Sequence, residues 1–292
     1  MPSLFKISPL VCVMLLLTPF RVGAQEGTIS YTPEEIKNLT SQFKSLAKDR
    51  KQPEDDAITS LGELVQAFEY LAKKGDETSK EDKKLQKSII DSLGWGLKRR
   101  KRPQVNLECA KALGRLGDKG GNKALVKWMD GTVLDTKAPN PEWVEYGFMA
   151  LASIGDEGSA LDLVFDYGPK GRHIDYSVAD KALGAIPYWK KLSAKNRKEL
   201  FKKVLMQIQS LDSGRRQSGN RQRIYQERFD RVKINGFKAL QELAGEAKPF
   251  ASVAKATDWW KANKGGKWQD FVGLNHRKKA ATKPKEDDKK NS

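Results

Sequence analysis

Six arginines within residues 215–231 are the side chains of this sequence best suited to bind a ligand. They are Arg215, Arg216, Arg221, Arg223, Arg228 and Arg231. A guanidinium group binds phosphate, sulfate or carboxylate through paired hydrogen bonds. In a helix, Arg221, Arg228 and Arg231 fall near one side, opposite or flanking the apolar stripe. The segment is therefore a candidate anion-binding site, and the alternative is a solvated helix face whose charge is balanced by Glu227 and Asp230.

The other residues whose side chains could act in catalysis or metal binding are better explained by structural roles. His173 and His276 have no neighbouring ligands at the spacing of a zinc site. Asp118 and Asp156 could form an acid pair, but their matching places in two successive repeats indicate turn residues. The glycine-rich stretch 117–123 lacks the Gly-Lys-Ser/Thr ending of a phosphate loop, and no nucleophile elbow or dinucleotide fingerprint occurs. We therefore predict that the protein is not an enzyme and has no metal site and no cofactor.

The first 24 residues predict an export signal. Lys6 gives a weakly positive start, and the apolar run Leu10–Leu17 is too short to span a bilayer, which takes roughly 20 residues. Small residues at 22–24 suit a signal peptidase, so Gln25 is the expected first residue of the mature chain. An uncleaved anchor is the alternative. Because no second long apolar segment follows, we predict no transmembrane segment in the mature chain.

The charge balance predicts an attraction to anions. The formal net charge is +17, and it falls to +15 when Lys6 and Arg21 leave with the signal. Such a charge attracts nucleic acid, anionic lipid or acidic glycans, and export argues against intracellular nucleic acid. Removal of the signal also leaves Cys109 without a partner for an internal disulfide. Cys109 lies on an apolar stripe, which indicates a buried structural thiol.

Apolar residues recur at helical spacing along the chain and predict the elements that carry these residues. Thr32-Pro33-Glu34-Glu35 is a capping box at the start of a leading helix. Five helical hairpins follow, and their apolar stripes fall in residues 58–71 with 85–97, 107–116 with 124–129, 143–154 with 161–167, 178–186 with 200–211, and 225–243 with 250–260. A flexible basic loop is expected at 213–220. No strand pattern is present.

Two further segments have structural predictions. The basic run 98–102 is expected to stabilise the negative end of a helix, which Pro103 then stops. Near the end of the last hairpin, four aromatic residues are expected to cap its apolar face: Trp259, Trp260, Trp268 and Phe271.

A small-Leu-small motif marks the first helix of three hairpins. The copies are Ala112-Leu113-Gly114, Ala150-Leu151-Ala152 and Ala182-Leu183-Gly184, with a fainter Ala239-Leu240. Their spacings are 38, 32 and 57 residues, and the last requires the basic segment to be looped out. The small residues predict close approach of paired helices. The glycines that follow, in Gly117-Asp118 and Gly155-Asp156, can end a helix in the left-handed conformation.

The stretch 112–118 resembles the HEAT-repeat family, most nearly the short bacterial HEAT-like repeats, and 150–156 is similar. The resemblance covers residues 105–187 and is degenerate in the first and last hairpins, where the Gly-Asp pair is lost. Residues 258–264 look like the ending of some exported bacterial HEAT-repeat proteins. The resemblance implies an all-α, right-handed α-solenoid of about five helical hairpins with a leading N-terminal helix, used to hold partners without catalysis.

The predicted organisation has four parts. These are a signal peptide at 1–24, a leading helix within 25–54, a HEAT-like α-solenoid at 55–271 and a basic disordered tail at 272–292. We expect a periplasmic or extracellular bacterial scaffold that mediates protein–protein interaction. The alternative is a solenoid that binds an anionic polymer, acidic glycan or nucleic acid, through the arginine segment.

Overall fold

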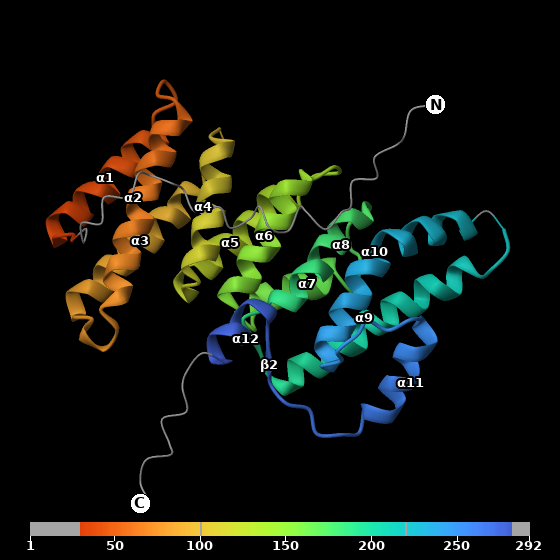
Figure 1. Cartoon of the computed structure of the whole chain (residues 1–292). Helices are drawn as coiled ribbons and strands as arrows, with labels where there is room; N and C mark the ends of the chain where they lie inside the picture. Colours follow the sequence, from red (N-terminus) through yellow and green to blue (C-terminus); the bar gives the residue numbers. More distant parts are fainter. Residues whose placement is uncertain (1–29, 100, 220, 282–292) are drawn as a thin grey trace, which may run out of the picture. The chain divides into compact units, whose positions relative to one another are not determined.

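The computed structural model describes residues 30–99, 101–219 and 221–281, so the predicted signal at 1–24 lies outside it. The described part of the chain is mostly helical, which confirms the all-α prediction (Figure 1). Its helices are α1 (Pro33–Lys48), α2 (Glu54–Lys73), α3 (Lys80–Gly96), α4 (Pro103–Leu116), α5 (Asn122–Trp128), α6 (Pro141–Ile154), α7 (Ser159–Tyr167), α8 (Tyr176–Ala185), α9 (Ala194–Arg215), α10 (Arg221–Ala244), α11 (Val253–Asn263) and α12 (Leu274–Ala281). Short 3-10 helices lie at Gly75–Glu77, Lys119–Gly121 and Ile186–Tyr188, and a π-helical turn lies at Met129–Val133.

The leading helix begins at the predicted capping box. The backbone N–H of Glu35 donates to Thr32 Oγ1, and the backbone N–H of Thr32 donates to Glu35 Oε2 over 2.7 Å. The helix occupies 33–48 of the predicted span 25–54. Its buried side chains, among them Ile36 and Phe43, face α2 and α3. Burial of this apolar face stabilises the helix more than its intrinsic propensity does.

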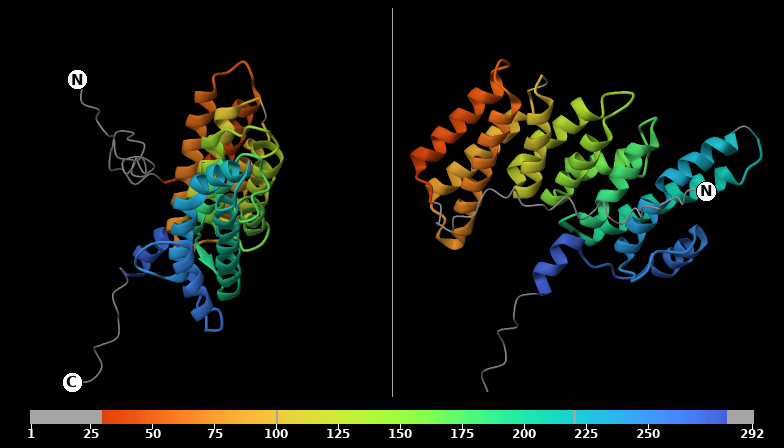
Figure 2. Two further views of the ribbon diagram at one scale, coloured as in Figure 1. Left: turned by 90° about the vertical axis from the view of Figure 1, so that its right-hand side faces the viewer. Right: turned by 45° about the horizontal axis from the view of Figure 1, so that its top comes forward.

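Helices α2 to α11 follow the predicted apolar stripes, but the last two hairpins are not paired as predicted, because α9 packs mainly on α10 and α11 packs on α9. The first helices of successive hairpins contact one another along the series α2, α4, α6, α8 and α10. The second helices α3, α5 and α7 also contact in series. In α9 all six predicted stripe residues are buried, namely Leu200, Phe201, Val204, Leu205, Ile208 and Leu211. Helices α9 and α10 lie side by side as a long antiparallel hairpin (Figures 1 and 2).

Both Gly-Asp pairs have the turn geometry that the sequence predicts. Gly117 and Gly155 end α4 and α6 with φ values of 61° and 70°, in the left-handed region that suits glycine. Asp118 accepts a hydrogen bond from the N–H of Gly120 over 2.7 Å. Asp156 accepts one from the N–H of Gly158 over 3.1 Å. These aspartates hold turns.

The small residues of the repeated motif lie between helices of neighbouring hairpins, and not between the two helices of one hairpin as predicted. A Cβ atom on Gly114 in α4 would come within 2.7 Å of Ala150 in α6. A Cβ atom on Gly184 in α8 would come within 3.1 Å of Asn235 in α10. The close approach is therefore between the first helices of neighbouring hairpins. This contact explains the small residues at Gly114 and Gly184.

The C-terminal segment departs from the predicted disordered tail at 272–292. Residues 271–272 form the strand β2 (Phe271–Val272), which pairs antiparallel with β1 (Lys191–Leu192). Helix α12 follows, and Arg277 Nη2 lies 3.0 Å from Glu242 Oε2 of α10. The sequence analysis missed these elements because two-residue strands carry no alternating pattern. Residues 282–292 lie outside the described part.

Three members of the predicted aromatic cap gather on Phe201 of α9, whereas the fourth, Phe271, lies in strand β2. The Phe201 ring lies 4.9 Å from Trp259, 5.5 Å from Trp260 and 5.8 Å from Trp268, measured between ring centroids. Phe250 joins the cluster at 6.4 Å from Phe201. The cluster covers one side of the α9–α10 hairpin, since α11 also packs on α9.

In the described residues, no helix combines the length and the apolar character that crossing a membrane requires.

Arg102 has a role different from the predicted one. Its side chain is buried, and it donates hydrogen bonds to the backbone carbonyl oxygens of Asp49, Gln52 and Pro53. The guanidinium therefore donates hydrogen bonds to carbonyl groups at the end of α1 and in the loop before α2. It does not stabilise the end of α3. Pro103 starts α4 as its first residue, where a missing N–H costs nothing.

Candidate functional site

The six candidate arginines lie on both sides of the turn that joins α9 to α10. Helix α9 continues to Arg215, so Ser213, Gly214 and Arg215 are helical and the predicted loop is shorter than 213–220. Tyr225 closes the hairpin, because a Cβ atom on Gly214 would come within 2.4 Å of its ring. The arginines of α10 begin at its first residue, Arg221.

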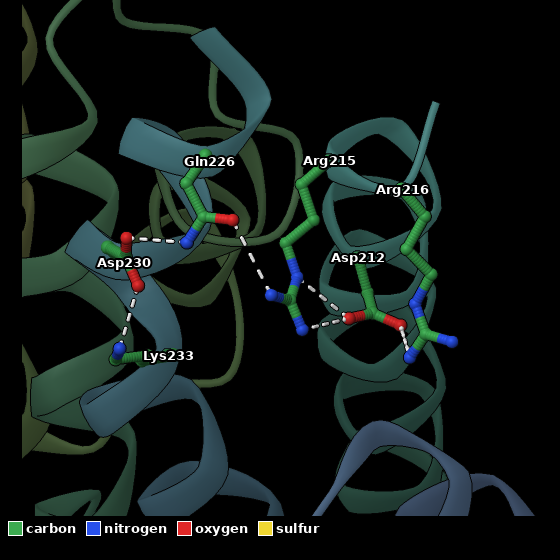
Figure 3. A network of polar contacts seen from close by, with 6 residues as sticks. All are labelled: Asp212, Arg215, Arg216, Gln226, Asp230 and Lys233. Carbon is green, nitrogen blue, oxygen red and sulfur yellow. Dashed lines mark hydrogen bonds and ion pairs between the residues drawn. The ribbon is translucent and has the colours of Figure 1, made fainter. Parts of the chain in front are cut away.

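Arg215 and Arg216 are engaged with the carboxylate of Asp212 (Figure 3). Arg215 donates from Nε over 2.9 Å and from Nη2 over 2.7 Å to Asp212 Oδ1. Arg216 Nη2 lies 2.7 Å from Asp212 Oδ2. The Arg215 guanidinium also lies 4.2 Å from the centroid of the buried Phe229 ring. The carboxylate and the ring hold Arg215 in the hairpin.

A second polar group continues this network along α10 (Figure 3). Arg215 Nη1 lies 3.5 Å from Gln226 Oε1, and Gln226 Nε2 donates to Asp230 over 2.6 Å. Lys233 Nζ donates to the other oxygen of Asp230 over 2.7 Å. Lys233 foremost, and then Gln226, lower the pKa of Asp230 below its usual range. Asp230 thus bonds to Lys233 and Gln226 and not to an arginine.

Arg221 and Arg223 are the outward members of the set. Arg221 is exposed at the first position of α10. The side chain of Arg223 is 87% exposed and lies 3.2 Å from the exposed Glu227. An exposed pair of this kind contributes little to stability. Arg223 has the exposure and the Glu227 neighbour that the solvated-face alternative describes, and both arginines are accessible to a ligand.

Arg228 and Arg231 face α8. The Arg228 guanidinium lies 4.9 Å from the centroid of the Tyr176 ring, a cation–π contact at the start of α8. Arg231 is exposed, and its charge helps to lower the pKa of Asp175, after the hydrogen bonds of that carboxylate with Ser177. The six arginines therefore form three groups with different neighbours and do not converge on one point.

A groove of about 450 Å³ lies on the other side of Tyr176, between α9 and the loop that joins α7 to α8. We call it the α9 groove, and its walls include Pro169, Lys170, Tyr176, Lys202, Met206 and Leu211. The sequence analysis missed this groove. The available signal was Met206, an apolar residue outside the buried stripe of α9, whose exposed fraction is 56%.

Exposed apolar residues gather in the same region of the chain. Of the five large apolar residues that are exposed in the described part, four lie between residues 174 and 234. They are Ile174, Met206, Ile224 and Ile234. Ile174 lies two residues before Tyr176, and Ile224 lies one helical turn before Arg228. The segments that carry Tyr176 and Arg228 thus expose apolar side chains, and Tyr, Met and Arg are residue types that are enriched at protein interfaces.

The other chemistry-bearing residues have structural partners. Cys109 is buried, and burial raises the pKa of its thiol far above the usual range. His173 Nε2 lies 2.7 Å from the carbonyl oxygen of Thr136, and its Nδ1 accepts from the N–H of Asp175 over 3.0 Å. The described residues contain no group of three or more His, Cys, Asp or Glu side chains suited to a metal ion.

Comparison with known proteins adds no family to this picture. Neither a scan of the sequence against protein-family models nor a search among curated proteins finds a match. The resemblance to HEAT-like repeats therefore rests on the sequence motifs alone.

Proposed function

We propose that this chain is a non-catalytic, HEAT-like scaffold that binds a protein partner outside the cytoplasm. In this proposal the hairpins form a right-handed α-solenoid of about five units behind the leading helix. Recurrence of the Gly-Asp turns and the serial contacts of α2, α4, α6, α8 and α10 support it. The export-signal pattern in residues 1–24 supports a periplasmic or extracellular location.

The observation that carries the proposal is the surface around Tyr176. Met206 lines the α9 groove together with Tyr176 and three lysines, and Ile174 and Ile224 are exposed on the segments that carry Tyr176 and Arg228. Arginine, tyrosine and methionine are enriched at protein interfaces, and exposed apolar side chains gain free energy when a partner covers them. The engagement of Asp118, Asp156 and Cys109 in turns and core supports a role without catalysis.

A second candidate function is binding of an anionic polymer. Arg221, Arg223 and Arg231 are exposed on α10, and exposed guanidinium groups suit phosphate, sulfate or carboxylate. Binding of this kind weakens steeply as salt rises, because counterions are released. Binding through the apolar surface tolerates salt far better. Salt dependence therefore separates the two functions.

The test is a crosslinking pull-down with residues 25–292 as bait on the native extracytoplasmic fraction. One variant carries I174D and I224D, and a second carries R221E and R223E. A control carries K83E and K87E on exposed positions of α3, which makes the same charge change elsewhere. The arginines at 215 and 216 are left intact because they hold the hairpin together.

The proposal expects the unaltered bait and the control to recover the same few proteins at moderate salt, with a loss for I174D/I224D. Recovery of the same proteins by I174D/I224D contradicts it. If the unaltered bait recovers only glycan or nucleic acid, and R221E/R223E recovers nothing, the anionic-polymer function takes its place.

A further inference from the structure

The α9 groove has cations along its edges. Among the residues that line it, three are lysines, Lys170, Lys202 and Lys203, and one is an acid, Glu199. Lys203 Nζ lies 3.4 Å from Glu199 Oε1, and Lys170 Nζ lies 2.5 Å from Oδ1 of Asp166, which is not among the lining residues. Lys202 is exposed, one helical turn before Met206. The excess of positive charge favours a ligand that carries carboxylates or other anionic groups.

The walls between these lysines are apolar. Met206 is 56% exposed, and Pro169, Tyr176 and the buried Leu211 complete the apolar lining. Methionine adapts its shape to different partners. A groove of about 450 Å³ holds a few side chains of a peptide and is too small for a folded domain.

The side chain of Gln207 lines the α9 groove and is held in one orientation. The side chain is only 8% exposed, and its Nε2 donates over 2.7 Å to the carbonyl oxygen of Gly168, which fixes the orientation of the amide. Its Oε1 is buried and has no hydrogen-bond partner within the described residues.

We propose that the α9 groove binds an acidic peptide segment of the protein partner, with an apolar side chain packed on Met206 and flanking carboxylates at Lys170, Lys202 and Lys203. This inference rests on the proposed scaffold function. Tyr176 forms one wall of the groove and carries Arg228 on its ring, so a longer segment can continue from the groove toward the arginines of α10.

The experiment uses a random peptide library displayed on phage and selected on the chain 25–292. The peptides enriched on the unaltered chain are synthesised with a fluorescent label for anisotropy titrations, with no prior selection against any variant. Polyglutamate of equal charge is the comparison ligand. The groove variants are M206D and K202E, and their matched controls are I234D on α10 and K195E, an exposed lysine near the start of α9.

We expect enriched peptides in which Asp or Glu flanks a bulky apolar residue. Affinity should fall roughly tenfold or more in M206D, as for a central apolar anchor, and remain unchanged in I234D. K202E should weaken binding while K195E should not. Polyglutamate should bind far more weakly than the selected peptides.

Three results overturn the inference: no enrichment, enriched peptides without acidic residues, or equal affinity of the selected peptides for M206D. Equal binding of polyglutamate also overturns it, because the apolar walls then contribute nothing. Circular dichroism of each variant confirms that its helices are intact. If M206D loses the peptides but still captures the same proteins in the pull-down, the groove inference fails while the scaffold function stands. If the unaltered bait captures no protein, the scaffold function itself fails.

Discussion

Gly114 of α4 lies directly against Ala150 of α6, because a Cβ atom on Gly114 would come within 2.7 Å of both the Cα and the Cβ atom of Ala150. Each residue belongs to its hairpin's copy of the small-Leu-small motif. The contact thus joins one hairpin to the next through the motif that repeats. Side chains larger than these at either position would push the two helices apart.

The substitution G114A should therefore destabilise the fold. Inside a helix, replacing glycine with alanine normally raises the free energy of unfolding by about 0.5–1 kcal/mol. Here the added methyl group meets the backbone of α6, and such overpacking lowers the free energy of unfolding by about 1–3 kcal/mol. The matched control is G62A in α2, where a Cβ atom meets nothing within 4 Å. Urea unfolding should show a lower midpoint for G114A and a higher one for G62A. A higher midpoint for G114A would show that the two helices can separate freely.

The sequence predicts the helices well because their cores follow simple periodicity. The apolar stripe of α9 is buried as predicted, and the turns at Gly117 and Gly155 have the conformation that their type implies. Contacts between distant residues are harder to predict. Arg102 bonds to carbonyl groups about fifty residues earlier in the chain, and nothing in the basic run around it singles out this residue.

The candidate site was predicted only in part. The six arginines were found from their type and density, but the sequence analysis ended α9 too early. With α9 extended to Arg215, the i,i+3 and i,i+4 pairs of Asp212 with Arg215 and Arg216 follow from helix geometry. The α9 groove depends on how the α7–α8 loop packs on α9, which periodicity does not encode.

Loss of the Arg102 guanidinium should destabilise the N-terminal helices. The R102A variant leaves the carbonyl groups of Asp49, Gln52 and Pro53 without this donor, at a cost of about 2 kcal/mol or more. The R102K variant keeps the charge but lacks the planar fork, so it should restore only part of the stability. The neighbouring exposed residue provides the control K101A, which should unfold like the unaltered chain. Thermal unfolding followed by circular dichroism measures all three, and full rescue by lysine would show that charge alone matters.

The half-buried carboxyl group of Asp180 should make stability depend on pH. Burial raises the pKa of Asp180, and its Oδ1 accepts from Asn235 over 2.9 Å. Because the folded pKa exceeds the unfolded one, ionisation opposes folding, and the contribution of Asp180 falls as pH rises through the folded pKa. The neutral variant D180N keeps an acceptor for Asn235, so it should be more stable than the unaltered chain at pH 7. This gain should vanish well below pH about 4, where the unaltered Asp180 is also neutral in both states.

Asp166 provides a control whose ionisation affects the stability of the fold in the opposite direction. The hydrogen bond from Lys170, and then the one from Arg172, lower the pKa of Asp166. Its carboxylate therefore stabilises the fold above its unfolded pKa of about 3.9, and this contribution is lost as pH falls through the lower folded pKa. D166N should be less stable than the unaltered chain at pH 7 and should match it in strong acid. If D180N and D166N shift the unfolding midpoint in the same direction at pH 7, the assignment of these two environments is wrong.

The arginines of the α9–α10 hairpin should differ sharply when their charge is reversed. R215E places a second carboxylate beside Asp212, which is 9% exposed, and removes the cation from the Phe229 ring. Because Arg215 is partly exposed and Arg216 still pairs with Asp212, we expect a cost of about 1–3 kcal/mol. R223E alters a side chain that is 87% exposed and should change stability by less than about 0.5 kcal/mol. Unfolding midpoints in urea compare the two, and equal midpoints would mean that the Asp212 network adds no stability. If the expected difference is found, charge reversal at Arg221 and Arg223 tests ligand binding by the folded hairpin, whereas reversal at Arg215 tests the hairpin itself.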